Sequence, residues 1–261
     1  MLRFNANLTT MYGTLPVTEA LAAAKADGFD AVECRTPFDE PAEKIAEALS
    51  HLDMALVQFN TPMGDFAAGE RGITCIPGRE QEFRASIELT LDYARHTQPR
   101  QINCPAGIAV RDVPREAQER LLAENLNWAA SRFADHGIRL QLEGINPIDN
   151  PGVLVGTAND AMRIIEMADH DNLWLQYDFY HQQVTSGGLV RTFERFQERI
   201  NHVQFADHPG RHEPGTGEIN FQFIMGELDR LDYSGWVGLE YVPAGTVKDG
   251  LGWLEAYRAN A

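Results

Sequence analysis

The sequence predicts an α/β protein built as a single (β/α)8 TIM barrel over residues 1–261. Short apolar segments alternate with longer helix-like segments in eight consecutive units, and no linker, low-complexity tract or charge block interrupts them. Strands that alternate with helices pair in parallel, and eight of them can close into a barrel. A length of 261 residues suits one such domain, because α/β barrels of this size are usually undivided.

The eight predicted strands are short and apolar. They cover residues 2–7, 31–34, 55–60, 101–104, 139–143, 173–178, 202–206 and 236–240. Segments between them carry the end signals of helices: residues 16–28 begin with proline and end with glycine, and residues 114–137 end with glycine. A further helix is predicted over residues 157–169, with Thr157 as its N-cap.

A doubly wound open sheet is the alternative fold. Such a sheet usually carries a glycine-rich phosphate-binding turn after an early strand. No G-x-G-x-x-G follows any predicted strand in this sequence. The pattern therefore favours the closed barrel, in which active sites lie at the carboxyl ends of the strands.

Charge and cysteine content limit the classes of partner. The chain has 22 Lys and Arg against 38 Asp and Glu, a formal net charge of −16. This charge argues against nucleic-acid and anionic-membrane partners, because both bind largely through Lys and Arg. Three cysteines without a CxxC pair, no apolar leader and no membrane-length apolar run indicate a cytoplasmic protein with reduced thiols. A homo-oligomer is compatible with the sequence.

The last four predicted strands carry oxygen-bearing side chains at or near their carboxyl ends. These residues are Glu143, Asp178, Gln204 and Glu240. Side chains of a strand alternate between its two faces, so the residues two positions earlier share the face of each of these four. Those residues are polar or small, whereas the opposite face of each strand carries Leu, Val, Tyr or Phe. We therefore expect the four side chains to face the barrel axis together.

Three carboxylates and one amide oxygen at one place predict a metal site. Neighbouring carboxylates repel and raise each other's pKa, and a divalent cation relieves that repulsion. A set of oxygen ligands without Cys or His suits Mg²⁺ or Mn²⁺, and no nucleotide cofactor is expected. The alternative is that each residue is a polar strand end that faces water. Asn7, Glu33, Asn60 and Asn103 end the first four strands and are expected to support the site.

Two long connections leave the carboxyl ends of strands, over residues 61–78 and 207–220. Structureless loops of this length are usually functional or disordered. Three arginines in or directly after these connections are candidates for binding an anionic substrate: Arg71, beside Glu70, Arg79 and Arg211. The alternative for Arg71, and for Arg79, is an ion pair with Glu70 or Glu80. A phosphate cradle at the PGTG segment is disfavoured by the acidic residues that flank it.

The spacing of two of the carboxylates indicates a reaction class. Glu143 and Glu240 end the fifth and eighth strands, so they should stand on different sides of the barrel mouth. One carboxylate can remove a proton beside a carbonyl group while the other returns a proton, and a metal can stabilise the enediolate between them. The expected reaction is aldose–ketose isomerisation or epimerisation. His181, three residues after Asp178, is expected to contact the ligand.

Several long motifs carry a family resemblance. They include GDFAAGERGITCIPGREQEF, LEGIN, QYDFYH, HVQFADHPGRHEPGTGEIN and GWVGLEY. On these motifs the sequence resembles the hydroxypyruvate isomerase family, within the xylose isomerase-like barrel superfamily, over nearly its whole length. The resemblance implies that hydroxypyruvate is converted to tartronate semialdehyde.

The resemblance also implies roles for individual residues. The implied metal ligands are Glu143, Asp178, Gln204 and Glu240. Two of these, Glu143 and Glu240, would also be the acid/base pair. The implied substrate contacts are His181 and Arg211, to which the loop motif GERGI adds Glu70 and Arg71.

Other activities of the superfamily remain alternatives. The 2-oxo-tetronate isomerases share most of the motifs, and this chain departs from the usual pattern at Gly144 and Val242, where relatives commonly have Pro and Lys. Ketose 3-epimerases usually have His in place of Gln204. A DNA-repair endonuclease is opposed by the net charge of −16. A sugar-binding module without catalysis would need no opposed pair of acids.

Overall fold

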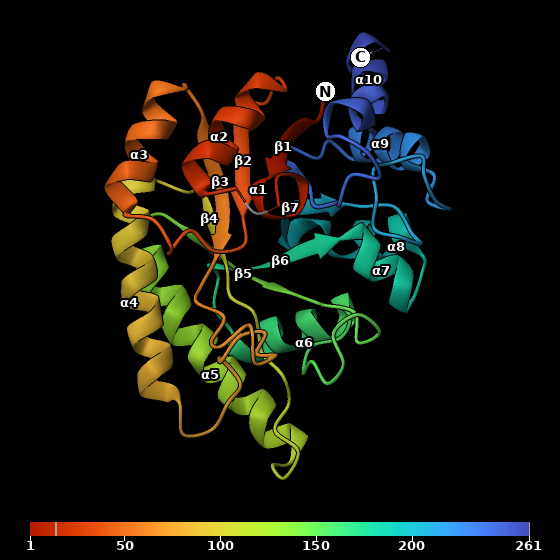
Figure 1. The fold of residues 1–261 in the computed structure, drawn as a ribbon. Coiled ribbons are helices and arrows are strands. Elements are labelled where there is room, and N and C mark those ends of the chain that lie inside the picture. The colour runs from red at the N-terminus through yellow and green to blue at the C-terminus, as the bar shows by residue number, and fades with distance from the viewer. Residues whose placement is uncertain (14, 261) are drawn as a thin grey trace.

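The computed structural model describes residues 1–13 and 15–260 and contains a closed barrel of eight strands (Figure 1). Each strand pairs in parallel with the next one along the chain, and the last pairs with the first. The strands are β1 (Arg3–Asn7), β2 (Ala31–Cys34), β3 (Ala55–Asn60), β4 (Gln101–Asn103), β5 (Arg139–Glu143), β6 (Leu173–Asp178), β7 (Ile200–Phe205) and β8 (Trp236–Leu239). The predicted (β/α)8 fold is confirmed.

Helices surround this barrel on its outside (Figure 1). The longer ones are α2 (Val17–Ala26), α3 (Ala42–His51), α4 (Glu80–Thr97), α5 (Arg115–Ala134), α6 (Ala158–Ala168), α8 (Leu189–Phe196), α9 (Phe221–Arg230) and α10 (Gly252–Asn260). Two short helices, α1 (Leu8–Met11) and α7 (Phe179–Thr185), directly follow β1 and β6. The predicted N-cap of α6 is confirmed, because Thr157 accepts a hydrogen bond from the backbone N–H of Asp160 at 3.0 Å.

The strand boundaries differ from the prediction mainly at β7. The strand begins at Ile200, two residues earlier than expected. The pairing with β6 shifts there: Leu175 pairs with Ile200 and Gln176 with His202, which leaves Asn201 as an extra residue. A β-bulge of this kind redirects a side chain. Asn201 consequently bonds to Gln141 and Gln101, both on barrel strands.

Apolar and polar side chains separate between the two faces of the strands as predicted. Leu140 and Leu142 of β5 are fully buried in the apolar core that the strands form with the helices. The alternate residues Gln141 and Glu143 are also buried but hydrogen-bond to side chains of other barrel strands. The barrel therefore has an apolar outer layer and a hydrogen-bonded interior, which directs charged strand ends toward the axis.

Two expectations about individual residue classes can be compared with the structure. The cysteines Cys34, Cys75 and Cys104 are free and buried, as predicted. Among the described residues, no helix is both long enough and apolar enough to cross a membrane.

The loop over residues 61–78 is partly packed against the barrel. Gly72 donates its N–H to the carbonyl of Met63, and Cys75 donates to that of Ala106. Asn125 of α5 donates to the carbonyl of Thr74 at 2.8 Å. Residues 73–75 are buried, whereas residues 64–69 are exposed. The loop therefore has a fixed base and an exposed tip.

Gly72 should be needed for the base of this loop. Its φ is +114°, and an added Cβ would lie 2.3 Å from the carbonyl oxygen of Pro105. We expect Gly72→Ala to lower the free energy of unfolding in urea by about 1–3 kcal/mol, because strain and steric overlap act together. Gly69→Ala is the matched control: its φ is +100° but nothing lies within 4 Å of the added Cβ. Equal losses in the two variants would contradict the steric argument.

Candidate active site

Three predicted strand-end carboxylates meet at the carboxyl end of the barrel. Glu143 ends β5, Asp178 ends β6, and Glu240 directly follows β8. One ligand atom from each lies within 4.8 Å of the others and of a nitrogen of His181. The parity of the strands therefore brings together residues almost 100 positions apart in the sequence, which is the arrangement that the sequence predicted.

Two of these carboxylates are only half satisfied. Oε2 of Glu143 accepts from Asn103 at 3.1 Å and from Gln176 at 2.9 Å, but its Oε1 is buried without a hydrogen-bond partner among the described residues. Oδ1 of Asp178 accepts from the backbone N–H of Tyr180, which caps α7, whereas its Oδ2 is likewise buried and unbonded. Buried polar atoms normally have partners. These two oxygens therefore mark a place for a bound group.

The third carboxylate is paired with an arginine. Oε2 of Glu240 accepts from Nη2 of Arg211 at 2.5 Å, and its Oε1 accepts from Asn7 at 3.3 Å. The same Nη2 lies 3.7 Å from Oδ2 of Asp178. Arg211 therefore supplies one positive charge to a group of three carboxylates, and Glu143 has no positively charged side chain of Lys or Arg within ion-pair distance in the described chain.

Burial raises the pKa of all three carboxyl groups, and the charges of neighbouring carboxylates add to this effect. For Glu143, burial is the main cause, followed by the charges of Glu240 and Asp178. Burial raises the pKa of Asp178 to about 7, although Arg211 acts in the opposite direction. Burial also raises the pKa of Glu240, against the effect of Arg211. The site therefore holds protons near neutral pH when no cation balances its charge.

This cluster could hold a metal ion. The donors are carboxylate oxygens, two of them buried and unbonded, and three ionised carboxylates with one arginine leave a formal charge of −2. A divalent cation would neutralise that charge and give both free oxygens a partner.

Gln204 lies beside the cluster but is used differently. Its Oε1 accepts from Gln176 at 2.8 Å, and its Nε2 donates to Glu33 at 2.7 Å. Gln176 also donates to Glu143, so Gln204 is connected to the carboxylates through one intervening amide. Its role as a metal ligand stays a prediction.

Glu33 is the centre of a supporting network inside the barrel. Its carboxylate accepts from Asn5, Asn7 and Gln204, and lies 2.7 Å from Nε2 of His202. Burial acts to raise the pKa of Glu33, but His202 and these donors outweigh it and hold the pKa below its usual range. The expected supporting role of Glu33, Asn7 and Asn103 agrees with these contacts, since Asn7 and Asn103 bond to Glu240 and Glu143.

His181 points its Nε2 at the cluster. This atom is 3.7 Å from Oε1 of Glu143 and 3.6 Å from Oδ2 of Asp178. The other ring nitrogen, Nδ1, accepts from Nδ2 of Asn146 at 2.7 Å. Asn146 is itself oriented by Asp149, whose backbone N–H donates to Oδ1 of Asn146 and whose carboxylate accepts from Nδ2.

These hydrogen bonds determine which ring nitrogen of His181 carries the proton. Because Nδ1 must accept from an amide N–H, the neutral ring carries its proton on Nε2. Burial, and secondarily Arg211, lower the pKa of His181 well below its usual value, so the ring stays neutral. His181 therefore presents an N–H donor to the cluster, which suits contact with a substrate oxygen.

The loop that carries Arg211 is organised by one buried carboxylate. Asp207 accepts hydrogen bonds from the backbone N–H groups of His208, Gly215, Gly217 and Ile219. The N–H groups of both glycines of the PGTG segment thus bond to Asp207, and that of Thr216 bonds to the carbonyl of Glu213, so this segment is not a phosphate cradle. The closed loop positions Arg211, whose guanidinium also lies 5.0 Å from the ring of Tyr180.

A pair of arginines encloses an aromatic ring of the other long loop. The guanidinium of Arg35 lies 4.2 Å from the centre of the Phe66 ring, and that of Arg71 lies 3.9 Å from it. Arg71 bonds to Asn150 and to two backbone carbonyls, and has no carboxylate partner among the described residues. Burial lowers the pKa of Arg35; Glu240 acts against this, and Arg71 and Arg211 add to it. These four charged groups therefore share the mouth of the barrel.

The carboxylate of Glu70 does not pair with any of these three arginines. It pairs with Arg79 and accepts the backbone N–H of Asp65 at 2.6 Å. Arg79 therefore forms the ion pair with Glu70 that the sequence offered as an alternative for both arginines, and Arg71 does not. A substrate contact by Glu70 stays a prediction.

Two residues of this site were not predicted from the sequence. Arg35 directly follows β2. It could have been predicted from the same signal as Glu143, a charged residue at the carboxyl end of a predicted strand. Asn146 has no such signal, because its importance depends on the contact with His181, 35 residues later in the chain.

Comparisons with known proteins agree with this geometry. A sequence profile described as xylose isomerase-like TIM barrel matches residues 21–257. The chain is 40% identical to the hydroxypyruvate isomerase of Escherichia coli, covering 99% of this chain and 100% of that protein. It is 37% identical to the 2-oxo-tetronate isomerase of Pectobacterium atrosepticum, covering 98% of each. A solved Brucella melitensis structure described as an AP endonuclease of family 2 superposes with a TM-score of 0.95 at 38% identity, covering 98% of this chain and 99% of that one.

The stability of the metal-free protein should fall as pH rises. The carboxyl of Asp178 has a pKa of about 7 in the folded protein, so the folded state holds more protons than the unfolded state between about pH 4 and about pH 7. The contribution of Asp178 to the free energy of unfolding is present below about pH 4 and is lost as pH rises from about 4 to about 7. Added Mn²⁺ should therefore raise the melting temperature more at about pH 8 than at about pH 5.5.

Asp178→Asn is the control for this measurement. The variant should lose part of the pH dependence and most of the Mn²⁺ effect in thermal unfolding followed by circular dichroism. An equal Mn²⁺ shift at both pH values in the wild type would contradict the charge argument.

Asn146→Asp should disturb the proton position on His181. An aspartate at this position can accept from Nδ1–H, so the favoured neutral tautomer should change from Nε2–H to Nδ1–H. The ring ¹⁵N chemical shifts of His181 would report the change directly. Asn150→Asp, a neighbouring substitution in contact with Arg71 and not with His181, should leave those shifts in place, and an unchanged tautomer in Asn146→Asp would refute the assignment.

Proposed function

This chain belongs to the xylose isomerase-like TIM barrel family, and we propose that it is an aldose–ketose isomerase that interconverts hydroxypyruvate and tartronate semialdehyde. The observation that carries the proposal is the pair Glu143 and Glu240 at one barrel mouth, both with raised pKa values. A carboxyl group with a raised pKa can accept a proton in one step and donate it in another. We place this reaction in the cytoplasm, consistent with three free buried cysteines.

The proposed metal is Mg²⁺ or Mn²⁺, held by Glu143, Asp178 and Glu240, with Gln204 as the fourth predicted ligand. Hard divalent cations prefer carboxylate and amide oxygens. The buried, unbonded oxygens of Glu143 and Asp178 support this assignment. When bound, the cation would stabilise negative charge on the two substrate oxygens during proton transfer.

The proposed proton transfers balance within the substrate. One of Glu143 and Glu240 removes a proton from C3 of hydroxypyruvate, and the other supplies a proton to C2. The C2 oxygen gains a proton and the C3 hydroxyl loses one, which turns the ketone into a hydroxyl group and the alcohol into an aldehyde. The Nε2–H of His181 faces this place and is suited to donate a hydrogen bond to a substrate oxygen.

Arginines at the mouth are the proposed binding groups for the substrate carboxylate. Arg211 lies among the catalytic carboxylates, and Arg71 has no acidic partner in the described chain. Arg35 adds a third positive charge on the other side of Phe66. Guanidinium groups can bind a carboxylate through two parallel hydrogen bonds. A small anionic hydroxy-oxo acid therefore fits this mouth.

Two other activities deserve comparison. Conversion of a 2-oxo-tetronate needs the same proton transfers on a substrate one carbon longer, and the similarity to a 2-oxo-tetronate isomerase makes it the second candidate. The endonuclease description of the Brucella structure belongs to that protein. A formal net charge of −16 on this chain opposes binding to a phosphate backbone.

Removal of either acid/base group should abolish isomerisation. In Glu143→Gln and Glu240→Gln we expect kcat to fall by about 10²–10⁴-fold, with no incorporation of solvent deuterium at C2 as followed by NMR in D₂O. Circular dichroism should show a folded barrel, because Gln is close to Glu in size. Glu88→Gln, in an exposed pair with Arg132 on the outer helices, is the matched control and should keep full activity. Full activity in both site variants would contradict the assignment.

A substrate series should separate the two candidate isomerases. The purified protein, supplied with Mn²⁺, is tested with hydroxypyruvate and with a 2-oxo-tetronate. A higher kcat/KM for hydroxypyruvate is expected. A clear preference for the 2-oxo-tetronate would overturn hydroxypyruvate as the proposed substrate but not the proposed proton transfers. Turnover that survives exhaustive chelation would refute the proposed role of the metal.

A further inference from the structure

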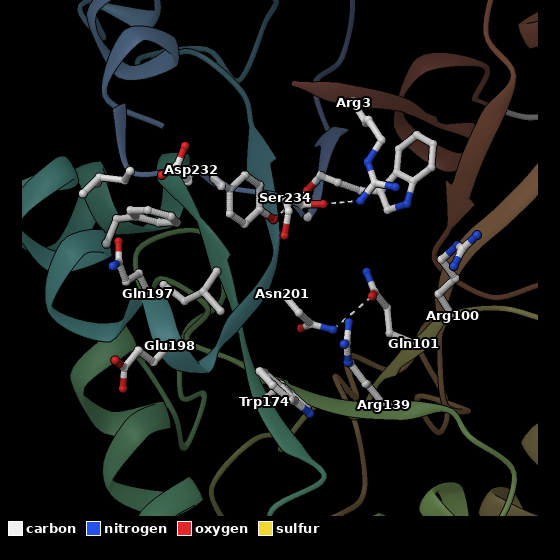
Figure 2. A pocket seen from close by; sticks show the side chains of 16 residues that line it. Arg3, Arg100, Gln101, Arg139, Trp174, Gln197, Glu198, Asn201, Asp232 and Ser234 are labelled. Carbon is white, nitrogen blue, oxygen red and sulfur yellow. Dashed lines mark hydrogen bonds between the residues drawn. The ribbon is translucent and has the colours of Figure 1, made fainter. Parts of the chain in front are cut away.

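A second pocket lies at the opposite mouth of the barrel, where the strands begin (Figure 2). It has a volume of about 330 Å³. Its walls include the first residues of β1, β4, β5 and β8, namely Arg3, Gln101, Arg139 and Trp236. In a TIM barrel this face usually serves stability and not catalysis.

The pocket residues belong to the same inward-facing series as the active site. Stepping by two along β5 leads from Arg139 through Gln141 to Glu143, and along β6 from Trp174 through Gln176 to Asp178. The interior of the barrel is therefore acidic at its carboxyl end and carries arginines at its amino end.

Three arginines line this pocket in a chain with a large negative charge: Arg3, Arg100 and Arg139. None of them forms an ion pair with a carboxylate in the part of the chain that the structure describes. Arg3 bonds to the carbonyl of Ser234 and lies 4.9 Å from the Trp236 ring, and Arg139 lies 4.9 Å from the Trp174 ring. Figure 2 shows Arg3 and Arg139 reaching toward the same open space from opposite sides.

Buried amide groups between the arginines add an unused donor. Gln101 is 2% exposed, and its Oε1 accepts from Asn201 at 3.0 Å. Its Nε2 is buried and has no partner among the described residues. The indole N–H groups of Trp174 and Trp236 are also buried and unbonded. Each of these three polar atoms is a donor, so a ligand rich in acceptor oxygens would match them.

Two carboxylates, Glu198 and Asp232, also line the pocket. In Figure 2 they lie on the far side of the pocket from Arg100. They reduce the net positive charge but do not pair with the three arginines, so the guanidinium groups remain available to an incoming anion.

We propose that this amino-terminal pocket is a second binding site, for a small polyvalent oxyanion bearing carboxylate or phosphate groups. Arg3 and Arg139 bind the anion from opposite sides, and Gln101 donates a further hydrogen bond at the floor. The site is separate from the metal cluster, and the inference does not depend on the proposed isomerase activity.

The test uses the full-length protein with Mn²⁺, titrated with inorganic phosphate and with succinate at constant ionic strength kept with NaCl. Trp174 and Trp236 line the pocket, so intrinsic tryptophan fluorescence reports binding there. We expect saturable binding of at least one probe at up to roughly 10 mM, and about tenfold weaker binding in Arg139→Gln. The preferred probe identifies the chemistry as phosphate or carboxylate.

Three variants make the result specific. Arg84→Gln removes an arginine that lies over Trp128 outside the pocket and should bind like the wild type. Arg71→Gln alters only the active-site mouth and should keep the fluorescence change, which separates the pocket from anion binding near the metal. Gln101→Leu should weaken binding even if Arg139→Gln folds poorly. Absence of saturation with both probes, or equal affinity in the wild type, Arg139→Gln and Gln101→Leu, would overturn the proposal.

Discussion

The repulsion among Glu143, Asp178 and Glu240 is the constraint on which the rest of this site depends. Three carboxylates within 4.8 Å of one another and of His181, two of them buried and Glu240 partly buried, are costly to ionise without positive charge nearby. The surrounding structure responds with amide donors from Asn7, Asn103 and Gln176 and with one guanidinium. These partners leave two carboxylate oxygens unbonded, so the cluster could hold a cation.

Hydrogen bonds between side chains continue from this site through the interior of the barrel. Amide side chains occupy many interior positions, and several of them hydrogen-bond to one another and to the carboxylates. Gln176 connects Glu143 to Gln204, and Gln204 connects in turn to Glu33. Rigid positioning of this kind keeps catalytic groups in place without reorganisation during the reaction. At the amino end the same interior leaves donors and arginines unused, and there an anion and not a cation fits.

The barrel and most of the candidate site could be predicted from local patterns. Seven of the eight strands were expected to start within one residue of their observed position, because apolar runs and their polar ends are visible in the sequence. β7 was the exception, since the bulge at Asn201 breaks the period of two. Arg35 was missed although it directly follows a predicted strand. Asn146 was missed although it ends the LEGIN motif, because its role depends on the contact with His181, 35 residues later in the chain.

The alternation of residue types along each strand is enough to predict which face is polar, and hence that Glu143, Asp178 and Glu240 face the barrel axis together. That information is local, because side-chain alternation depends only on the backbone of one strand. Three features of the site follow from the folded arrangement of the loops and not from any local pattern: Arg211 enters the carboxylate cluster, Arg79 and not Arg71 pairs with Glu70, and Asn146 sets the proton position on His181. These contacts depend on the paths of loops between distant residues, and no periodicity of the chain encodes such paths.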